Sequence, residues 1–218
     1  MTELPIIFKG EMVRAILEGR KTQTRRIVKC PSWALAGEWD IRPTGDGVNW
    51  LSCANKEGSE VFAPCPYGKP GDRLWVRETW RPHSVKMSCT VQYRADGCHI
   101  TIENTPGAAN RWIDVRRPEE QWPKMESPKW RSSIHMPRWA SRISLEVTNV
   151  RVERLQEISE EDVKSEGTDW ERYAPGPDWP IQNAYAILWD SINAKKHPWD
   201  SNPLVWVLEF KKLNGETA

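Results

Sequence analysis

The sequence has few of the features that mark secreted, membrane or metal-dependent proteins. Its 218 residues include five cysteines, an odd number, and no two of them form a C-x-x-C pair. With no signal peptide and no long apolar run, it predicts a reduced, cytoplasmic protein that does not bind membranes. The spacings of Cys30, Cys53, Cys65, Cys98 and His99 fit no zinc module. We therefore expect no metal and no cofactor.

An excess of charge of one sign is also lacking. The chain has 31 Lys and Arg against 30 Asp and Glu, a net charge of +1. The protein is not a polycation, so any nucleic-acid surface must be a local patch. The one excess is in tryptophan, with fourteen residues, and each can bury roughly 150–250 Å². Most must anchor the core or the loops, and a few are candidates for stacking on bases.

A basic stretch rich in hydroxyl groups follows the first predicted helix. Apolar residues at helical spacing over 12–17 predict a helix that stops at Gly19, because glycine enters the left-handed conformation without a Cβ clash. Lys21 and Thr24 come next, and three arginines share the stretch: Arg20, Arg25 and Arg26. Cations lower the pKa of a nearby lysine, and a hydroxyl beside a neutral amine is a candidate nucleophile. The arginines suit a phosphate or a base, or a solvated turn at a helix end.

Two later places are candidates for binding. Glu78 follows an apolar strand pattern beside Arg77, and it either faces the same cavity as Lys21 or is a structural ion-paired glutamate. The segment 129–142 alternates cations with tryptophans, which suits a groove with stacking faces or a loop held by cation–π contacts. We read His135 as structural. The candidate binding residues here are Glu78, Trp80, Arg138, Trp139 and Arg142.

The hydrophobic patterns predict a mixed chain of strands and helices. The longest strand is expected over 143–155, with a bulge near Thr148, where the alternation changes phase. Other strands are expected over 5–8, 73–80, 91–97, 98–102 and 204–212. Helices are expected over 12–17, 159–166 and 184–193. Ser159 should cap the second helix, with Asp162 at the capping-box position and Gly167 as its stop.

This order of elements fits an α+β fold, a small mixed β-barrel with helices at its ends and a ligand in its mouth. We expect a single domain over 1–218. Loop insertions rich in Trp or Pro are expected at about 30–70, 103–128 and 168–183, and the first should contain a small hairpin of its own.

Gly19-x-Lys21-x-x-Thr24-x-Arg26 resembles the signature G-x-K-x-x-[ST]-x-R of the ASCH family, a branch of the PUA-like β-barrel fold. The segment 155–167 is similar to the family's helix after the central strands, and 205–211 to its closing strand. Segments 74–80 and 135–142 resemble those of the longer ASCH proteins of bacteriophages and prophages. The resemblance covers roughly half the chain. It implies a PUA-like barrel and a phage or prophage protein in the bacterial cytoplasm.

The small ASCH proteins that hydrolyse N4-acetylcytidine carry a similar GRKTxTxR run. By motif position, the resemblance assigns catalysis to Lys21, Thr24 and Glu166. It implies that Thr24 attacks the acyl carbonyl or positions water, and that Lys21 accepts the proton. Glu166 would orient the lysine or donate to the leaving N4 amine, and Arg26 would hold the base or its sugar.

Two physical points bear on this assignment. Residues three apart do not share one face of a regular strand, so the backbone must kink between Gly19 and Thr24. A glutamate beside Lys21 also raises the pKa of that lysine, which opposes its role as a base. Glu78 is the alternative source of the carboxylate.

Three functions remain open. The first is an amidohydrolase that removes an acyl group from N4 of a modified cytosine, in a nucleoside or a nucleic acid. The second is a non-catalytic module that binds RNA or a modified base, and the third is a metal-independent ribonuclease. The expected partner is a modified nucleoside or a nucleic acid, RNA rather than DNA. Binding a polymer requires a basic track from 25–26 to 138–142, and its affinity should depend on salt.

Overall fold

The structure is a computed structural model that describes residues 1–29, 34–43, 49–55, 60–85, 88–101, 129–173, 176 and 179–213. The insertion expected over 103–128 lies wholly outside these residues, and so does Cys30.

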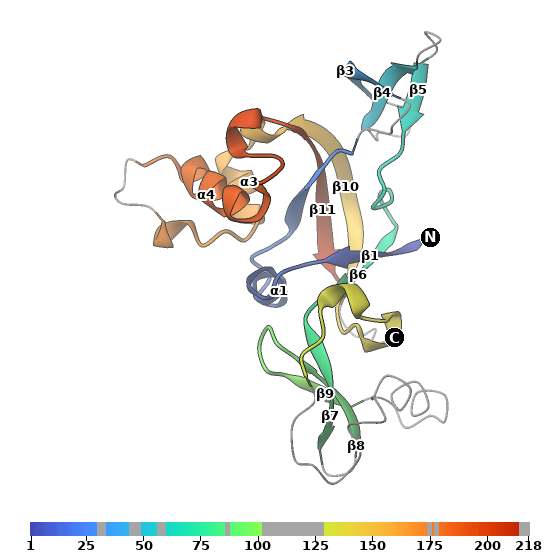
Figure 1. The fold of residues 1–218 in the computed structure, drawn as a ribbon, viewed down its shortest axis with the longest axis vertical. Helices are drawn as coiled ribbons and strands as arrows, with labels where there is room; N and C mark the ends of the chain where they lie inside the picture. The colour runs from blue at the N-terminus through green and yellow to red at the C-terminus, as the bar shows by residue number, and fades with distance from the viewer. Residues whose placement is uncertain are drawn as a thin grey trace.

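Five strands form the central sheet (Figure 1), and the order across it is β1 (Glu3–Ile7), β6 (Arg73–Arg77), β10 (Ser144–Arg154), β11 (Leu204–Lys212) and β2 (Gln23–Ile27). β1 and β6 run parallel, and the other neighbours are antiparallel. The predicted bulge is confirmed, because the register of β10 against β11 shifts between Val147 and Asn149.

The sheet is open in the described part of the chain, so the expected closed barrel is not observed. β1 and β2 are its two edges. The side chain of Arg26 on β2 links them: its Nη2 donates to the backbone oxygen of Ile7 at 2.6 Å, and its guanidinium lies 5.0 Å from the ring centre of Phe8. In a closed barrel, backbone hydrogen bonds would join β1 to β2. Here the side chain of Arg26 joins them instead. The α+β class is confirmed.

Two small sheets lie at opposite ends of the central sheet (Figure 1). The first is a meander of β3 (Ala34–Pro43), β4 (Asn49–Asn55) and β5 (Glu60–Ala63), one strand more than the hairpin expected in the first insertion. The second contains β7 (Trp80–Val85), β8 (Ser88–Tyr93) and β9 (His99–Thr101). The Asp-Gly turn between β8 and β9 is confirmed by a φ of +73° at Gly97.

The helices begin and end close to their predicted limits: α1 spans Gly10–Leu17, α3 Glu160–Ser165 and α4 Ile181–Asn193. Gly19 and Gly167 both have positive φ, as their role as helix stops requires. Ser159 caps α3, because its side chain accepts a hydrogen bond from Asp162 N at 3.1 Å. The Asp162 carboxylate does not complete a capping box. It binds two arginines instead.

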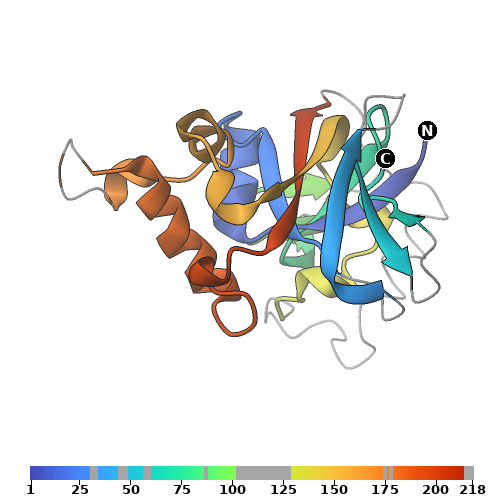
Figure 2. The same cartoon turned by 90° about the horizontal axis from the view of Figure 1, so that it is seen from above.

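Short 3-10 turns connect these elements: η2 (Ser133–His135), η3 (Arg138–Ala140), η4 (Leu155–Glu157), η5 (Trp170–Arg172) and η6 (Trp199–Ser201). The main core joins α1 to the central sheet, where Val13 and Ile16 belong to one buried cluster with residues of β6, β10 and β11. A second core joins α3 and α4 to β11, and these helices stand to one side of the sheet (Figure 2). None of the described helices has the length and apolar character that crossing a bilayer requires.

Candidate functional site

The structure brings Lys21 and Glu166 into contact although they are 145 positions apart in the chain. Lys21 Nζ donates to Glu166 Oε2 at 2.6 Å and to the backbone oxygen of the same residue at 2.9 Å. Both side chains are buried, with exposed fractions of 0% and 4%. The pKa of Lys21 is lowered overall, because burial, the largest cause, and the charges of Arg26 and Arg25 together outweigh the raising effect of the Glu166 carboxylate. The Glu166 carboxylate therefore does not cancel the lowering of the Lys21 pKa that a catalytic base needs.

The backbone bends between α1 and β2 as the three-residue spacing of Lys21 and Thr24 required. The amides of Arg20 and Lys21 both donate to the backbone oxygen of Ala15, and β2 begins only at Gln23. Lys21 thus precedes the regular strand that holds Thr24, and it pairs with Glu166 through an isolated antiparallel bridge. The side chains of Lys21 and Thr24 therefore need not point to opposite faces, as residues three apart within one regular strand would.

Gly167 allows this close approach. A Cβ at this position would lie 2.8 Å from the Cβ of Lys21 and 2.9 Å from that of Ala15. Its φ of +69° is also a conformation that favours glycine. The glycine that ends α3 therefore sets the position of the preceding Glu166 against Lys21.

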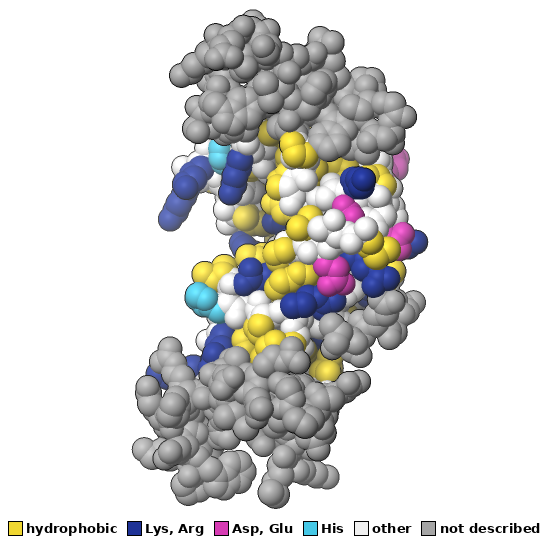
Figure 3. Space-filling model, turned by 90° about the vertical axis from the view of Figure 1, so that its right-hand side faces the viewer, with side chains coloured by type: hydrophobic (Ala, Val, Ile, Leu, Met, Phe, Trp, Pro, Cys, Tyr) yellow, Lys and Arg dark blue, Asp and Glu magenta, His cyan; other side chains and the backbone are white. Residues whose placement is uncertain are grey.

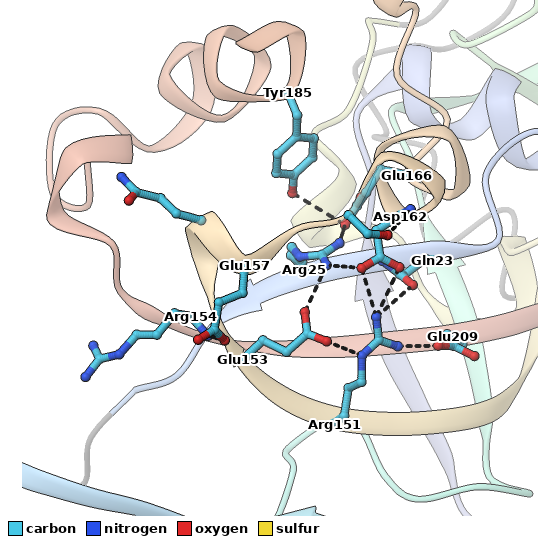
Figure 4. A network of polar contacts seen from close by, with 12 residues as sticks. Gln23, Arg25, Arg151, Glu153, Arg154, Glu157, Asp162, Glu166, Tyr185 and Glu209 are labelled. Atoms are coloured by element: carbon cyan, nitrogen blue, oxygen red, sulfur yellow. Dashed lines mark hydrogen bonds and ion pairs between the residues drawn. The ribbon is translucent and has the colours of Figure 1, made fainter. Parts of the chain in front are cut away.

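Arg25 is part of a buried network and is not a free phosphate ligand (Figure 4). Its side chain has no exposed surface, and Nη2 donates to Asp162 Oδ2 at 2.7 Å and to Glu153 Oε2 at 3.0 Å. Arg151 binds Asp162 as well, at 3.1 Å, and also contacts Glu153 and Glu209. The network ties α3 to β2, β10 and β11, and so holds the helix that ends at Glu166.

The charge balance around Asp162 keeps this carboxylate ionised. Burial raises the pKa of Asp162, but its hydrogen bond with Arg25 and the charges of Arg25 and Arg151 outweigh that effect and lower the pKa. The sequence contained one signal for this network, because charged residues alternate with apolar ones over 150–154. Nothing in the pattern paired them with Arg25.

Tyr185 on α4 is a site residue that the sequence reasoning missed. Its hydroxyl donates to Glu166 Oε1 at 3.4 Å, and Arg25 Nη1 lies 3.5 Å from the same oxygen. Glu166 therefore faces Lys21 with one oxygen and Tyr185 with the other. Burial raises the pKa of Tyr185 well above its usual value, so the hydroxyl keeps its proton. In the sequence this residue is one more aromatic in a helix pattern.

Two cavities adjoin Glu166. The larger has a volume of about 220 Å³ and is lined by Arg20, Thr168 and residues of α1 and α4. The smaller, about 70 Å³, is lined by Thr24, Arg25, Arg26 and Tyr185. Met12, Glu166, Leu188 and Ile192 line both cavities. Lys21 lines neither of these two cavities, so it contacts the cavity wall through Glu166.

Glu78 belongs to a different cluster. It is buried and receives two hydrogen bonds from Arg142, at 2.8 and 3.0 Å. Arg142 also binds Asp96 and lies 4.1 Å from the ring centre of Tyr93. The structural alternative for Glu78 is therefore the observed one, and the carboxylate in contact with Lys21 is that of Glu166.

The basic track from 25–26 to 138–142 that binding a polymer would require does not run through Arg25 and Arg142, because both are committed to buried ion pairs. Trp80 has no exposed surface and packs edge-on against Trp139 at 5.9 Å, so it offers no stacking face. Arg138 binds Glu3 at 3.1 Å.

Arg20 is exposed at the rim of the larger cavity, where it pairs with Glu18 and donates to the backbone oxygen of Gly167.

Of the candidate cysteine ligands, Cys65 and Cys98 are free thiols. No cluster of three or more His, Cys, Asp or Glu side chains suited to a metal occurs among the described residues.

Comparison with known proteins gives no match to this chain, whether with family models, with curated proteins or with solved structures.

Proposed function

We propose that this protein has a PUA-like fold of the ASCH type and is an amidohydrolase that removes an acyl group from N4 of a modified cytosine. The contact between Lys21 and Glu166 supports the proposal most directly. The signature resemblance assigns these two residues to one site, and the fold brings them within 2.6 Å across 145 positions. Thr24, the third assigned residue, lines a cavity together with Glu166.

The chemistry follows from these positions. Thr24 Oγ1 bonds to the acyl carbon while its proton passes to the Lys21–Glu166 pair, where burial favours a neutral amine. The C–N4 bond then breaks as Glu166 gives a proton to the leaving amine. Water hydrolyses the resulting threonine ester, which releases the acid and restores the hydroxyl.

The cavity volumes suggest how a substrate would lie. The smaller cavity, at about 70 Å³, has the volume of roughly two water molecules. It has room for a short acyl group but not for a nucleoside, so the base would occupy the larger cavity. Arg26 lines the smaller cavity, and its buried Nε has no hydrogen-bond partner in the described part of the chain. The carbonyl oxygen of the acyl group would satisfy this donor.

The test is hydrolysis of N4-acetylcytidine, with cytidine and acetate measured by chromatography. We expect release by the wild type and none by Lys21→Ala or Thr24→Ala. Thr22→Ala is the matched control, because Thr22 is exposed two residues from Thr24 and should retain activity. No cytidine from a folded wild-type protein would overturn the proposal, and so would undiminished release by Thr24→Ala.

A further inference from the structure

Two histidines lie side by side on the small sheet of β7, β8 and β9, away from α3 and the Lys21–Glu166 site (Figure 1). The ring centres of His83 and His99 are 4.7 Å apart. We propose that these two histidines bind a divalent late transition-metal ion, with copper(II) and nickel(II) preferred to zinc. This function goes beyond the proposed hydrolysis and does not depend on it.

The register of the small sheet places both histidines on one face. His83 on β7 pairs with Thr90 of β8, and His99 on β9 pairs with Gln92 of the same strand. Because Thr90 and Gln92 are two positions apart, they and their cross-strand partners share a face. β7 and β9 both flank β8, which sets their backbones roughly 9–10 Å apart. The two imidazole rings therefore lean toward each other over β8.

The separation of the two rings fits a shared metal ion. Imidazole nitrogens bind a divalent metal at about 2.0–2.1 Å, which puts the ion about 3.2 Å from each ring centre. Two rings on one ion are then about 4.5 Å apart at the right angle of a square-planar site, and about 5.2 Å apart at a tetrahedral angle. The observed 4.7 Å lies nearer the square-planar value. Square-planar nitrogen sites are typical of copper(II) and nickel(II).

The surroundings of the pair suit an ion that keeps part of its water shell. The rings are tilted by 44°, so they are not stacked face to face. His83 is half-buried and His99 is exposed, which leaves access for an ion and its water ligands. The backbone of His83 is held in place, because its oxygen accepts a hydrogen bond from Oγ1 of the buried Thr90 at 2.6 Å. Ligands on a strand that is held in this way are positioned more precisely than ligands on a loop.

The close pair does not come from a surface rich in histidine. The chain has four histidines. On the face drawn in Figure 3, the histidines among the described residues form only small patches. The other two are His135 in η2 and His197 beyond α4, and they serve as internal controls for binding to a single histidine.

Two observations limit the strength of the site. Among the described residues no group of three or more His, Cys, Asp or Glu is placed to hold a metal, so the pair supplies two ligands and water supplies the others. The charge of Arg81, on the same face, opposes a cation. Its guanidinium lies 4.4 Å from the ring centre of Trp130, and its Nε donates to Gln92 Oε1 at 2.7 Å. The expectation of no metal rested on the cysteine spacings and did not include His83.

The test is isothermal titration calorimetry of the whole chain with Ni²⁺, Cu²⁺ and Zn²⁺ chlorides near neutral pH. We expect one Ni²⁺ or Cu²⁺ ion per chain, with Zn²⁺ bound more weakly. His83→Ala and His99→Ala should each weaken Ni²⁺ binding at least about tenfold, the lower end of the loss that even outer-shell partners of a metal cause. His135→Ala and His197→Ala are the matched controls and should leave the affinity unchanged. Circular dichroism checks that every variant is folded.

The double variant His83→Ala/His99→Ala separates a shared ion from two independent ones. A shared ion needs both rings, so the double variant should lose little more affinity than either single variant, whereas losses at independent sites would add. Electron paramagnetic resonance of the Cu²⁺-loaded protein gives a second measurement. The spectrum should show coupling to two histidine nitrogens in the wild type and to only one in His99→Ala.

The proposal fails if neither Ni²⁺ nor Cu²⁺ shows saturable binding, or if the losses in the two single variants add. It also fails if His135→Ala or His197→Ala weakens binding as much as His99→Ala does. Tighter binding of Zn²⁺ than of Ni²⁺ would overturn the assigned geometry. These outcomes are separable from the hydrolase proposal, because metal binding is measured without substrate and neither His83 nor His99 belongs to the Lys21–Glu166 site.

Discussion

Replacing Glu166 by glutamine removes the charge that faces Lys21 and keeps the size of the side chain. The lysine then retains the backbone oxygen at position 166, 2.9 Å away, but has lost the carboxylate at 2.6 Å. Both side chains are almost fully buried, so water cannot take the place of the lost charge. We therefore expect a large loss of stability from a change of very few atoms.

The size of the loss has two estimates. Breaking a buried ion pair by removing one partner costs about 3–5 kcal/mol. Lys21 can instead lose its proton, which for an ordinary lysine costs about 4.6 kcal/mol at pH 7 and sets an upper limit. We expect Glu166→Gln to lower the free energy of unfolding by about 3–4 kcal/mol, and Tm by roughly 6–16 °C in a chain of this size.

A pH series identifies the cause. If Lys21 is neutral in the folded variant, that state binds one proton fewer than the unfolded chain below the ordinary lysine pKa. The free energy of unfolding then rises with pH, by about 1.4 kcal/mol per unit between pH 7 and 9. The reference is the double variant Lys21→Met/Glu166→Gln, which has no lysine to titrate.

The assay is urea unfolding followed by tryptophan fluorescence at pH 7, 8 and 9. A loss below about 1 kcal/mol at pH 7 would contradict the magnitude expected for a buried pair. Parallel pH profiles for Glu166→Gln and the double variant would show that Lys21 does not release its proton. Either result would refute the reasoning.

Three further predictions concern the surroundings of the site and the thiols. Gly167→Ala should destabilise the protein by at least about 1 kcal/mol more than Gly19→Ala in thermal unfolding. Both positions have positive φ, but only a Cβ at position 167 would meet other atoms. Equal losses of stability in the two variants would contradict this. Tyr185→Phe should reduce the loss of stability above about pH 10, because the unfolded tyrosine ionises there while burial raises the pKa of the folded one. Urea unfolding between pH 9 and 11 tests this, and identical profiles would count against it. Burial raises the pKa of Cys65 to about 12. Iodoacetamide at pH 8 should therefore label the exposed Cys98 far faster than Cys65. Peptide mass spectrometry measures both labelling rates, and comparable rates would contradict this.

Local signals in the sequence identified many of the element boundaries. The helix stops at Gly19 and Gly167, the cap at Ser159 and the bulge near Thr148 all depend on residues within a few positions of one another. Such features are local in their physics, since they need only backbone conformation, short-range hydrogen bonds and strand alternation. The strand over 204–212 was predicted with the observed bounds for the same reason.

Contacts between residues far apart in the chain were harder to predict from the sequence. The strand that begins at Trp80 was missed as a separate element, because Pro82 interrupts its pattern. Glu78 had two possible partners in the sequence, and its pairing with Arg142 was decided by the packing of β6 against the segment after η3. Arg25 looked like a free cation, whereas the fold surrounds it with carboxylates from α3 and β10.

The sequence by itself determined the class of the fold and many element boundaries, and its resemblance to the ASCH signature made Lys21, Thr24 and Glu166 candidate residues. The tertiary structure decided which carboxylate faces Lys21 and that Tyr185 from α4 reaches Glu166. It also decided how the backbone bends at Lys21, before the strand that holds Thr24. The reason is physical: a helix stop or a cap depends on neighbours along the chain. A buried charge depends on whatever side chains the rest of the chain brings within a few ångströms of it.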